Sequence, residues 1–277
     1  MTDSTLAFIG GGNMAGSLIG GLVTDGWDPG RIRVADPDAG RTKQLAERFS
    51  VITSLDNTEV IEGADAVILA VKPQQLHGVA SQIAPAIHRQ QPVVISIAAG
   101  IRETSLRDWL GEGTAIVRCM PNTPAMVQSG ATALYANTRV SEAQRSLAES
   151  VLRAVGLALW VDDEDQMDAV TALSGSGPAY FFLFMEALQE AGTRLGLESG
   201  TARLLALQTA FGAAKMALES REDAATLRRQ VTSPGGTTER AIEVFRQEGL
   251  EDIVLKALQA AAGRSRELAL ELGGDAS

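Results

Sequence analysis

The chain has 277 residues, of which 45% are hydrophobic and 21% are charged, and its formal net charge at pH 7 is -10. This composition is typical of a globular protein and excludes an intrinsically disordered chain. The acidic balance argues against nucleic acid and anionic membranes as partners, because both are bound by clustered Lys and Arg. Apolar runs are shorter than the roughly 20 residues that cross a bilayer.

The only cysteine, Cys119, cannot form a disulfide within the chain or build a zinc site by itself. We therefore predict a small buried thiol in a reducing compartment and no metal site. The first residues lack the basic start of a secretory signal, so we expect a cytoplasmic protein.

Short apolar segments alternate with helical patterns over the first 161 residues. We predict strands at residues 5–9, 32–35, 66–71, 93–97, 114–119, 131–135 and 157–161. The first two strands are followed by helical patterns at 13–24 and 38–49, and the nearly continuous apolar segment 66–71 is typical of a buried parallel strand. This alternation predicts a Rossmann-type α/β domain with a mostly parallel sheet over residues 1–161.

The composition changes at the acidic segment 162–165, after which no segment has a strand pattern. Residues 178–195, 201–219 and 250–272 carry apolar side chains at helical spacing, so we predict an all-helical substrate-binding and dimerisation domain over 162–277. The helix at 178–195 is apolar nearly all round and must be buried. In so small a domain a partner subunit would cover it, which predicts an obligate oligomer.

The segment from Gly10 to Gly16 fits the pattern G-x-G-x-x-A between a strand and a helix. Gly10 permits a tight turn, Gly12 lets a pyrophosphate approach the backbone, and Ala15 lets the helix pack close to the strand. The N-terminus of that helix, with Asn13 and Met14, would bind the pyrophosphate. The loop and its context predict a dinucleotide-binding site.

Asp36 ends the second predicted strand and belongs to the same site. An acid there typically binds the ribose hydroxyls of NAD and repels the phosphate of NADP. Four basic residues close in sequence could instead pair with that phosphate: Arg31, Arg33, Arg41 and Lys43. Arg41 could equally be a solvated helix residue. The sequence leaves the choice between NADPH and NADH open.

Ligands of parallel sheets bind beyond the carboxyl ends of the strands. The predicted cofactor contacts in those loops are Ala70, Val71, Lys72, Pro73, Ala98, Ala99, Gly100 and Asn122. Lys72 could alternatively be a surface lysine. Asn122 could hold the nicotinamide or its ribose, or be a turn asparagine. Asn57 could lie near the adenosine, or be a plain N-cap.

Two motifs stand out in the second half. Residues 174–177 are small and allow close approach to a ligand or to another helix, and Pro178 suits the first turn of the next helix. Ser176 and Gly177 are candidate substrate contacts.

Residues 232–238 open a helix that runs to about Gln247. We predict Ser233 as its N-cap and Pro234 as its first residue, so that the two glycines that follow leave amides free for a small carboxylate. Each glycine in a first turn costs up to ~1 kcal/mol, so a purely structural cap would not need both. The predicted substrate-binding residues are Ser233, Gly235, Gly236, Thr237 and Thr238.

In these motifs, and in their order along nearly the whole chain, the sequence resembles the pyrroline-5-carboxylate reductases. The matching segments are 8–14, 71–73, 96–100, 120–124, 174–180 and 233–238. The resemblance implies a preference for NADPH and helices that intertwine with a second subunit, in dimers that often assemble into decamers. It implies that Thr238 hydrogen-bonds the imine nitrogen and that residues 233–237 hold the substrate carboxylate. It places Asn57, Lys72 and Glu164 near the cofactor or substrate.

The chemistry that these residues could perform agrees with the resemblance. Hydride transfer to a C=N bond needs mainly orientation, and a neutral donor such as Thr238 could act as the catalytic acid for the nitrogen. One rival is a β-hydroxyacid dehydrogenase, but the position of that group's catalytic lysine, four residues after Gly177, is Phe181 here. Another is a non-enzymatic NAD(P)H sensor, which would have no use for an anion site at residues 235–236. The sequence therefore predicts reduction of pyrroline-5-carboxylate to proline, the last step of proline biosynthesis.

Overall fold

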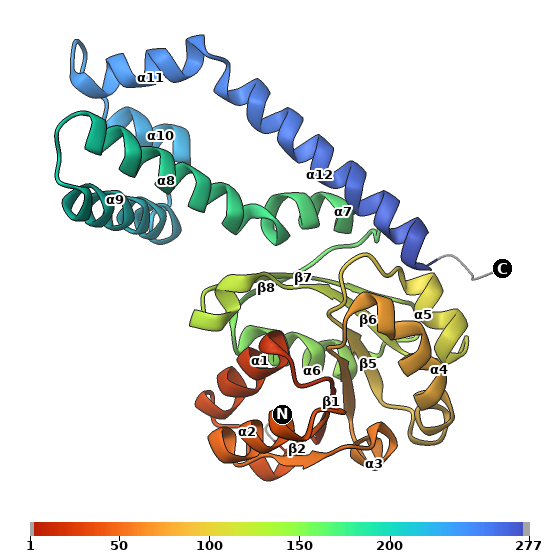
Figure 1. Ribbon diagram of the computed structural model, residues 1–277. Helices are drawn as coiled ribbons and strands as arrows, with labels where there is room; N and C mark the ends of the chain where they lie inside the picture. The colour runs from red at the N-terminus through yellow and green to blue at the C-terminus, as the bar shows by residue number, and fades with distance from the viewer. Residues whose placement is uncertain (1–2, 274–277) are drawn as a thin grey trace. The chain divides into compact units, whose positions relative to one another are not determined.

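An eight-stranded sheet organises the first part of the chain in the computed structural model, which describes residues 3–273 (Figure 1). The strands in chain order are β1 (Leu6–Ile9), β2 (Ile32–Ala35), β3 (Ile52–Ser54), β4 (Ala66–Leu69), β5 (Val93–Ser96), β6 (Ile116–Met120), β7 (Gly130–Ala136) and β8 (Gly156–Trp160). Their spatial order is β3-β2-β1-β4-β5-β6-β7-β8, and only the pair of β6 and β7 is antiparallel. The predicted mostly parallel sheet is confirmed.

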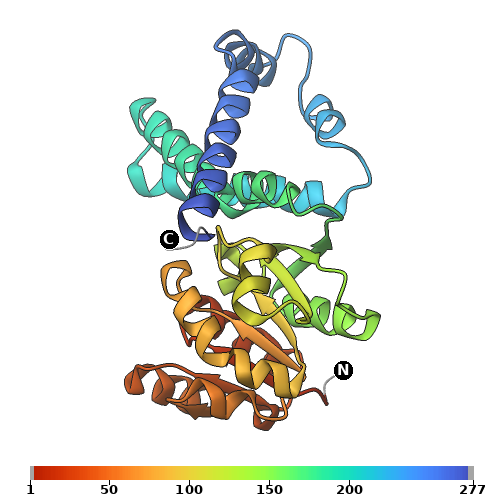
Figure 2. The same ribbon diagram turned by 90° about the vertical axis from the view of Figure 1, so that its right-hand side faces the viewer.

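Helices cover both faces of this sheet (Figures 1 and 2). Side chains alternate between the faces along each strand, so Phe8 and Ile9 of β1 belong to different core clusters. One cluster is completed by α1 (Asn13–Thr24), α2 (Ala39–Phe49) and α6 (Glu142–Arg153), and the other by α3 (Asn57–Ile61), α4 (Pro73–Gln90) and α5 (Glu103–Leu110).

The strand order reverses between β1 and β4, which are neighbours although two strands separate them in sequence. Their carboxyl ends, at Ile9 and Leu69, therefore open the crevice where ligands of doubly wound sheets bind. The loops that follow, with η2 (Thr123–Val127) after β6, carry the predicted cofactor contacts.

The second half is helical, as predicted. Its elements are α7 (Gln166–Val170), the π-helical turn η3 (Thr171–Gly175), α8 (Gly177–Arg194), α9 (Ser199–Glu219), α10 (Ala224–Gln230), α11 (Thr237–Gln247) and α12 (Leu250–Gly273). Tertiary contacts divide the chain into a helical unit, Gly177–Ala260, and a sheet unit made of the residues before and after it. The predicted division of roles between residues 1–161 and 162–277 stays a prediction.

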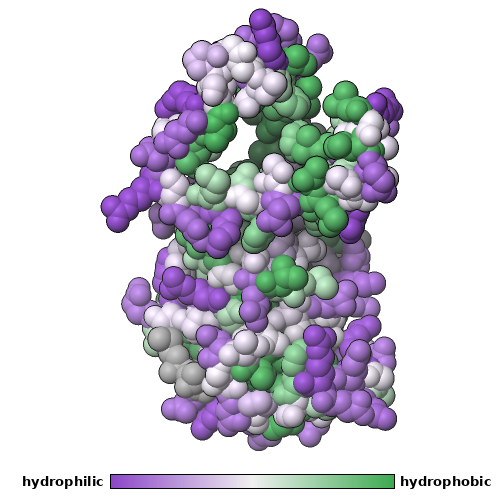
Figure 3. Space-filling view, turned by 90° about the vertical axis from the view of Figure 1, so that its left-hand side faces the viewer, coloured by the Kyte–Doolittle hydropathy of each residue, from purple (hydrophilic) through white to green (hydrophobic). Residues whose placement is uncertain are grey.

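The helical unit buries very little apolar surface by itself. Within its described residues, Ala202 and Ala206 are the only buried hydrophobic side chains. Phe181 and Phe182 of α8 are 66% and 64% exposed, and Figure 3 shows apolar residues gathered over this part of the molecule. An exposed apolar surface of this kind marks an interaction site. Across the described residues, no helix is long and apolar enough to cross a membrane.

Candidate active site

The glycine loop after β1 has the geometry of a phosphate cradle. Gly10 has φ +98°, and a Cβ there would lie 2.7 Å from the Ala70 carbonyl oxygen, so both the backbone and the space require glycine. Gly12 is the N-cap of α1 and provides no side-chain cap, which leaves the first-turn amides of α1 available to an anion. A Cβ at Gly12 would meet no protein atom within 4 Å. These residues fit a dinucleotide pyrophosphate.

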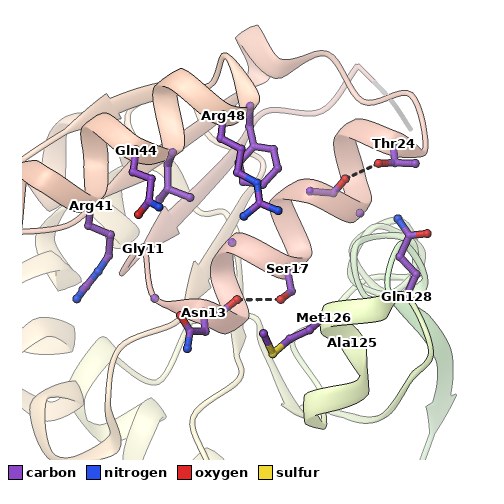
Figure 4. Close-up of a pocket in the computed structure, with 16 residues that line it drawn as sticks. Gly11, Asn13, Ser17, Thr24, Arg41, Gln44, Arg48, Ala125, Met126 and Gln128 are labelled. Carbon is purple, nitrogen blue, oxygen red and sulfur yellow. Dashed lines mark hydrogen bonds between the residues drawn. The ribbon is translucent and has the colours of Figure 1, made fainter. Parts of the chain in front are cut away.

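A polar groove of about 390 Å³ begins at this loop and is bordered by α1, α2 and η2 (Figure 4). Gly12 and Asn13 line its α1 side, and Arg41, Gln44 and Arg48 line its α2 side. The groove therefore connects the predicted pyrophosphate site with the positively charged face of α2.

Asp36 lies directly behind the glycine loop with its side chain only 5% exposed. One carboxylate oxygen accepts the Gly11 N–H at 2.8 Å and Nη1 of Arg41 at 2.9 Å. The other oxygen accepts the Asp38 N–H at 2.9 Å. Burial acts to raise the pKa of Asp36, but the hydrogen bonds from Gly11, Asp38 and Arg41 outweigh it, and the pKa lies below its ordinary value.

The other basic residues close to Asp36 in sequence interact with protein groups. The Arg31 guanidinium donates to the Asp3 carbonyl, and that of Arg33 donates to the Glu62 carbonyl. Lys43 pairs with Glu47 one turn along α2, at 3.8 Å. Among these basic residues, Arg41 is the one that lines the groove.

The loop that follows β4 faces the glycine loop. The Ala70 N–H donates to the Ile9 carbonyl at 2.8 Å, which holds the two strand ends together. Val71 follows, Lys72 is the exposed N-cap of α4, and Pro73 is the first residue of that helix. This geometry presents Lys72 at the edge of the crevice.

Asn57 is not an N-cap. Asp56 caps α3, because its Oδ1 accepts the Thr58 N–H at 2.7 Å, and Asn57 is the first helical residue. Its Nδ2 donates to Oε1 of Gln82 at 3.0 Å.

The loop after β5 packs against the last turns of α12. Ala98 is buried and Ala99 is exposed. Gly100 has φ +74°, and a Cβ there would lie 3.5 Å from Leu268 and 3.5 Å from Leu272. The left-handed conformation explains Gly100 without a ligand.

Both groups of the Asn122 side chain are used by the protein. Its Oδ1 accepts the Ala131 N–H at 2.9 Å, and its Nδ2 donates to the Ser174 carbonyl at 3.0 Å. Asn122 thus ties the end of β6 to β7 and to the π-helical turn. Its contact with the nicotinamide stays a prediction.

Glu164 lies in a mostly buried ion-pair network. Its Oε1 accepts Nη1 of Arg118 at 2.8 Å and the Glu103 N–H at 2.7 Å, and its Oε2 lies 3.8 Å from Nε of Arg102. Arg118 is a charged residue inside an otherwise apolar strand, and it needs this partner because an unpaired buried charge is costly. That pattern was the available sequence signal for the network.

The small-residue motif at 174–177 lies where the π-helical turn meets α8. Ser176 donates its N–H to the Thr171 carbonyl at 2.8 Å, Gly177 begins α8, and Pro178 follows in its first turn, as predicted. Turns of this kind are frequent at functional sites. The alternatives of ligand contact and helix packing both remain compatible with this position.

The start of α11 differs from the prediction. The helix begins at Thr237 with Gly236 as N-cap, so Ser233 is not the N-cap and Pro234 is not helical. Gly235 has φ +70°, which turns the chain before the helix.

The two glycine amides are also not free. The Gly236 N–H donates to the Ser233 carbonyl at 3.0 Å, and the Gly235 N–H donates to Oε2 of Glu239 at 2.7 Å. No side chain caps the first turn of α11, so its amides, including those of Thr237 and Thr238, are the ones available to an anion.

The predicted residues thus fall into two groups. The sheet unit holds the cofactor candidates and Ser176, and the helical unit holds Gly177 and residues 233–238. Gly11 was not among the predicted site residues, although it lies between the two motif glycines and donates its N–H to Asp36. Among the described residues, no cluster of His, Cys, Asp and Glu could hold a metal ion.

Two family descriptions match the chain. "Pyrroline-5-carboxylate reductase dimerisation" matches residues 164–268, which indicates self-association, and "NADP oxidoreductase coenzyme F420-dependent" matches residues 5–100. A pyrroline-5-carboxylate reductase of Pseudomonas aeruginosa is 53% identical over 99% of this chain and 100% of the relative.

Solved structures agree with these matches. A pyrroline-5-carboxylate reductase from Coxiella burnetii is 48% identical, with a TM-score of 0.94 over 96% of this chain and 98% of that one. A Plasmodium falciparum pyrroline carboxylate reductase with NADP bound is 27% identical, with a TM-score of 0.84 over 97% and 99%. Full-length identity, the glycine loop and the helical second half together establish that the chain belongs to the pyrroline-5-carboxylate reductase family.

Proposed function

We propose that this protein reduces 1-pyrroline-5-carboxylate to proline with NADPH, the last step of proline biosynthesis, in the cytoplasm. The observation that carries the proposal is the pairing, in one chain, of a glycine cradle at the β1–β4 crevice with an uncapped helix start at α11. The first suits a dinucleotide and the second suits a small carboxylate. The identity with the Pseudomonas aeruginosa reductase over the full length supports the same substrate.

The residues of the sheet unit would hold and orient the cofactor. Gly10 and Gly12 would lie against the pyrophosphate with Asn13, Met14 and Ala15 at the start of α1, where the helix dipole favours an anion. The loops of β4, β5 and β6 would border the rest, and Asn57, Lys72 and Glu164 are proposed contacts from the family resemblance. When bound, the nicotinamide supplies the hydride.

The residues of α11 would hold the substrate. The amides of Thr237 and Thr238 would bind the carboxylate, with the turn of Ser233, Gly235 and Gly236 shaping the approach. The Thr238 hydroxyl would donate to the imine nitrogen and assist its protonation. Ser176 and Gly177 are proposed to border the substrate from the junction between the π-helical turn and α8.

We also propose an intertwined homodimer as the smallest complete enzyme, and its assembly into decamers. The support is the nearly unburied helical unit, in which α8 and α9 leave large apolar side chains exposed. A second copy of the same unit would bury them.

The direct experiment mixes purified protein with pyrroline-5-carboxylate and follows loss of the nicotinamide absorbance, in parallel with NADPH and NADH. Rapid oxidation, with proline as the product, is expected. Tight cofactor binding without oxidation would instead support the alternative of a non-enzymatic NAD(P)H sensor.

A further inference from the structure

We infer that Arg41, held in place by the buried carboxylate of Asp36, recognises the 2′-phosphate of NADPH and gives this enzyme its choice between the two cofactors. The inference deepens the proposed function, because it assumes a dinucleotide on the glycine loop. Its experiment uses binding as the readout, so it can fail or succeed independently of turnover.

The acid at the end of β2 is not free to bind a ribose. An aspartate at the end of β2 selects NAD when its carboxylate is free to accept both ribose hydroxyls. Here both oxygens of Asp36 already accept hydrogen bonds from Gly11, Asp38 and Arg41, and the side chain is 5% exposed. The carboxylate therefore faces the protein and serves as an anchor.

Arg41, in contrast, has donors left for a ligand. Only Nη1 of Arg41 reaches Asp36, while its Nη2 lies 3.8 Å from Oδ2 of Asp38. The side chain is 45% exposed and lines the groove that begins at Gly11 and Gly12. A guanidinium has five N–H donors in a planar fork suited to phosphate, so Arg41 keeps donors for a ligand.

The neighbouring charge of Asp38 would oppose a phosphate. That carboxylate caps α2, because its Oδ1 accepts the N–H groups of Gly40 at 2.8 Å and of Arg41 at 3.2 Å. Backbone donors thus engage both oxygens of Asp36 but only Oδ1 of Asp38, whose charge is offset in part by the dipole at the N-terminus of α2.

Gly11 completes the arrangement. A Cβ there would lie 2.8 Å from Leu45, 3.5 Å from Cδ of Arg41 and 3.5 Å from Cβ of Asp36. The middle glycine of the loop thus makes room for Leu45 and lies beside the Asp36–Arg41 pair, and its N–H to Asp36 links the phosphate cradle to the proposed selectivity residue.

The experiment compares two fragments that lack the nicotinamide, adenosine 2′,5′-bisphosphate and 5′-AMP, by titration calorimetry with the full-length protein. Wild type should bind the 2′-phosphorylated fragment more tightly. Arg41→Ala should weaken that binding by about 10- to 100-fold, as expected for a lost charge-assisted hydrogen bond, and leave 5′-AMP within about twofold.

Two further variants separate recognition from structure. Arg41→Gln keeps a neutral donor beside Asp36 and should still lose the preference, whereas Arg48→Ala, on the same groove without a bond to Asp36, should keep it. The inference would be overturned if the Arg41 variants bound both fragments more weakly to the same degree, or bound neither of them more weakly. A selective loss in a protein that does not reduce pyrroline-5-carboxylate would uphold the inference and reject the proposed function.

Discussion

Asp36 and Asn122 are predicted ligand contacts whose side chains are already hydrogen-bonded within the protein. Each side chain points to a ligand site in the sequence pattern, and each is bonded to backbone groups in the structure. Buried polar groups are nearly always paired, and losing a partner costs more than a bond contributes. Substitution of either residue should therefore affect stability as well as ligands.

Asp36→Asn should lower the free energy of unfolding at neutral pH by about 1 to 3 kcal/mol, because three donors lose their charged acceptor. The folded pKa of Asp36 is depressed, so its contribution is complete above the pKa of an unfolded aspartate, about 3.9, and is lost as the pH falls through the folded value. Urea unfolding at a series of pH values should show the gap between wild type and variant narrowing only below about pH 4. A gap that widens there would contradict this assignment.

Asn122→Ala should destabilise the protein by about 1 to 3 kcal/mol, because the Ala131 N–H and the Ser174 carbonyl lose their partner. Thermal or chemical unfolding measures the effect. Thr123→Ala changes the exposed neighbour and is the matched control. If the two variants were equally stable, the hydrogen bonds of Asn122 would not stabilise the contact of β6 with β7 and the π-helical turn.

Thr238→Ala should reduce kcat by about 10²- to 10⁴-fold if its hydroxyl assists protonation of the imine. Thr238→Ser keeps the hydroxyl and should retain most activity. Steady-state kinetics with saturating cofactor tests this, and unchanged kcat and KM in the alanine variant would remove Thr238 from the mechanism.

Among the elements, those with a strong local pattern were predicted best. The helix after the glycine loop and strand β2 have the predicted bounds, because buried apolar spacing and loop glycines define them locally. Strand β3 was missed because it is a three-residue edge strand whose Ile52 is 48% exposed, so it has no burial pattern. Helix α10 was also missed, and none of its residues is buried.

The start of α11 lies later in the chain than predicted, for a different reason. Ser-Pro is a common helix opening, but the left-handed Gly235 and the turn from Gly236 to Ser233 delay the helix to Thr237. The residue types of the site were therefore predictable, whereas the identity of its free amides depended on backbone angles. The bonds of Asn122 and Glu164 depend on residues far away in sequence, which periodicity cannot reveal.

Gly235→Ala should raise KM for pyrroline-5-carboxylate while leaving the Kd for NADPH unchanged, because a side chain at φ +70° costs about 1 to 2 kcal/mol and distorts the turn before α11. Gly249→Ala is a close control, since Gly249 has φ +75°, also lies in the helical unit and has open space around its Cβ position. The assignment fails if both variants raise KM equally.

For the whole molecule, the exposed apolar side chains of the helical unit make stability depend on association. Phe181→Glu should shift the protein toward monomers at micromolar concentration, because it places a charge on a surface that a second copy would bury. Sedimentation velocity measures the change. Ser81→Glu, on the exposed face of α4, adds the same charge to the sheet unit and should leave the assembly intact.

The final helix, α12, belongs to the helical unit through its first residues and to the sheet unit from Ala261 onward. Ser265 donates to the buried Asp168 at 2.7 Å, and Ser105 donates to the Gly273 carbonyl at 3.2 Å. Residues that follow the helical unit in sequence thus complete the part of the fold that precedes it. Domains ordinarily fold in order of synthesis, but here the sheet unit has to wait for its closing helix, α12, until the whole helical unit has been synthesised.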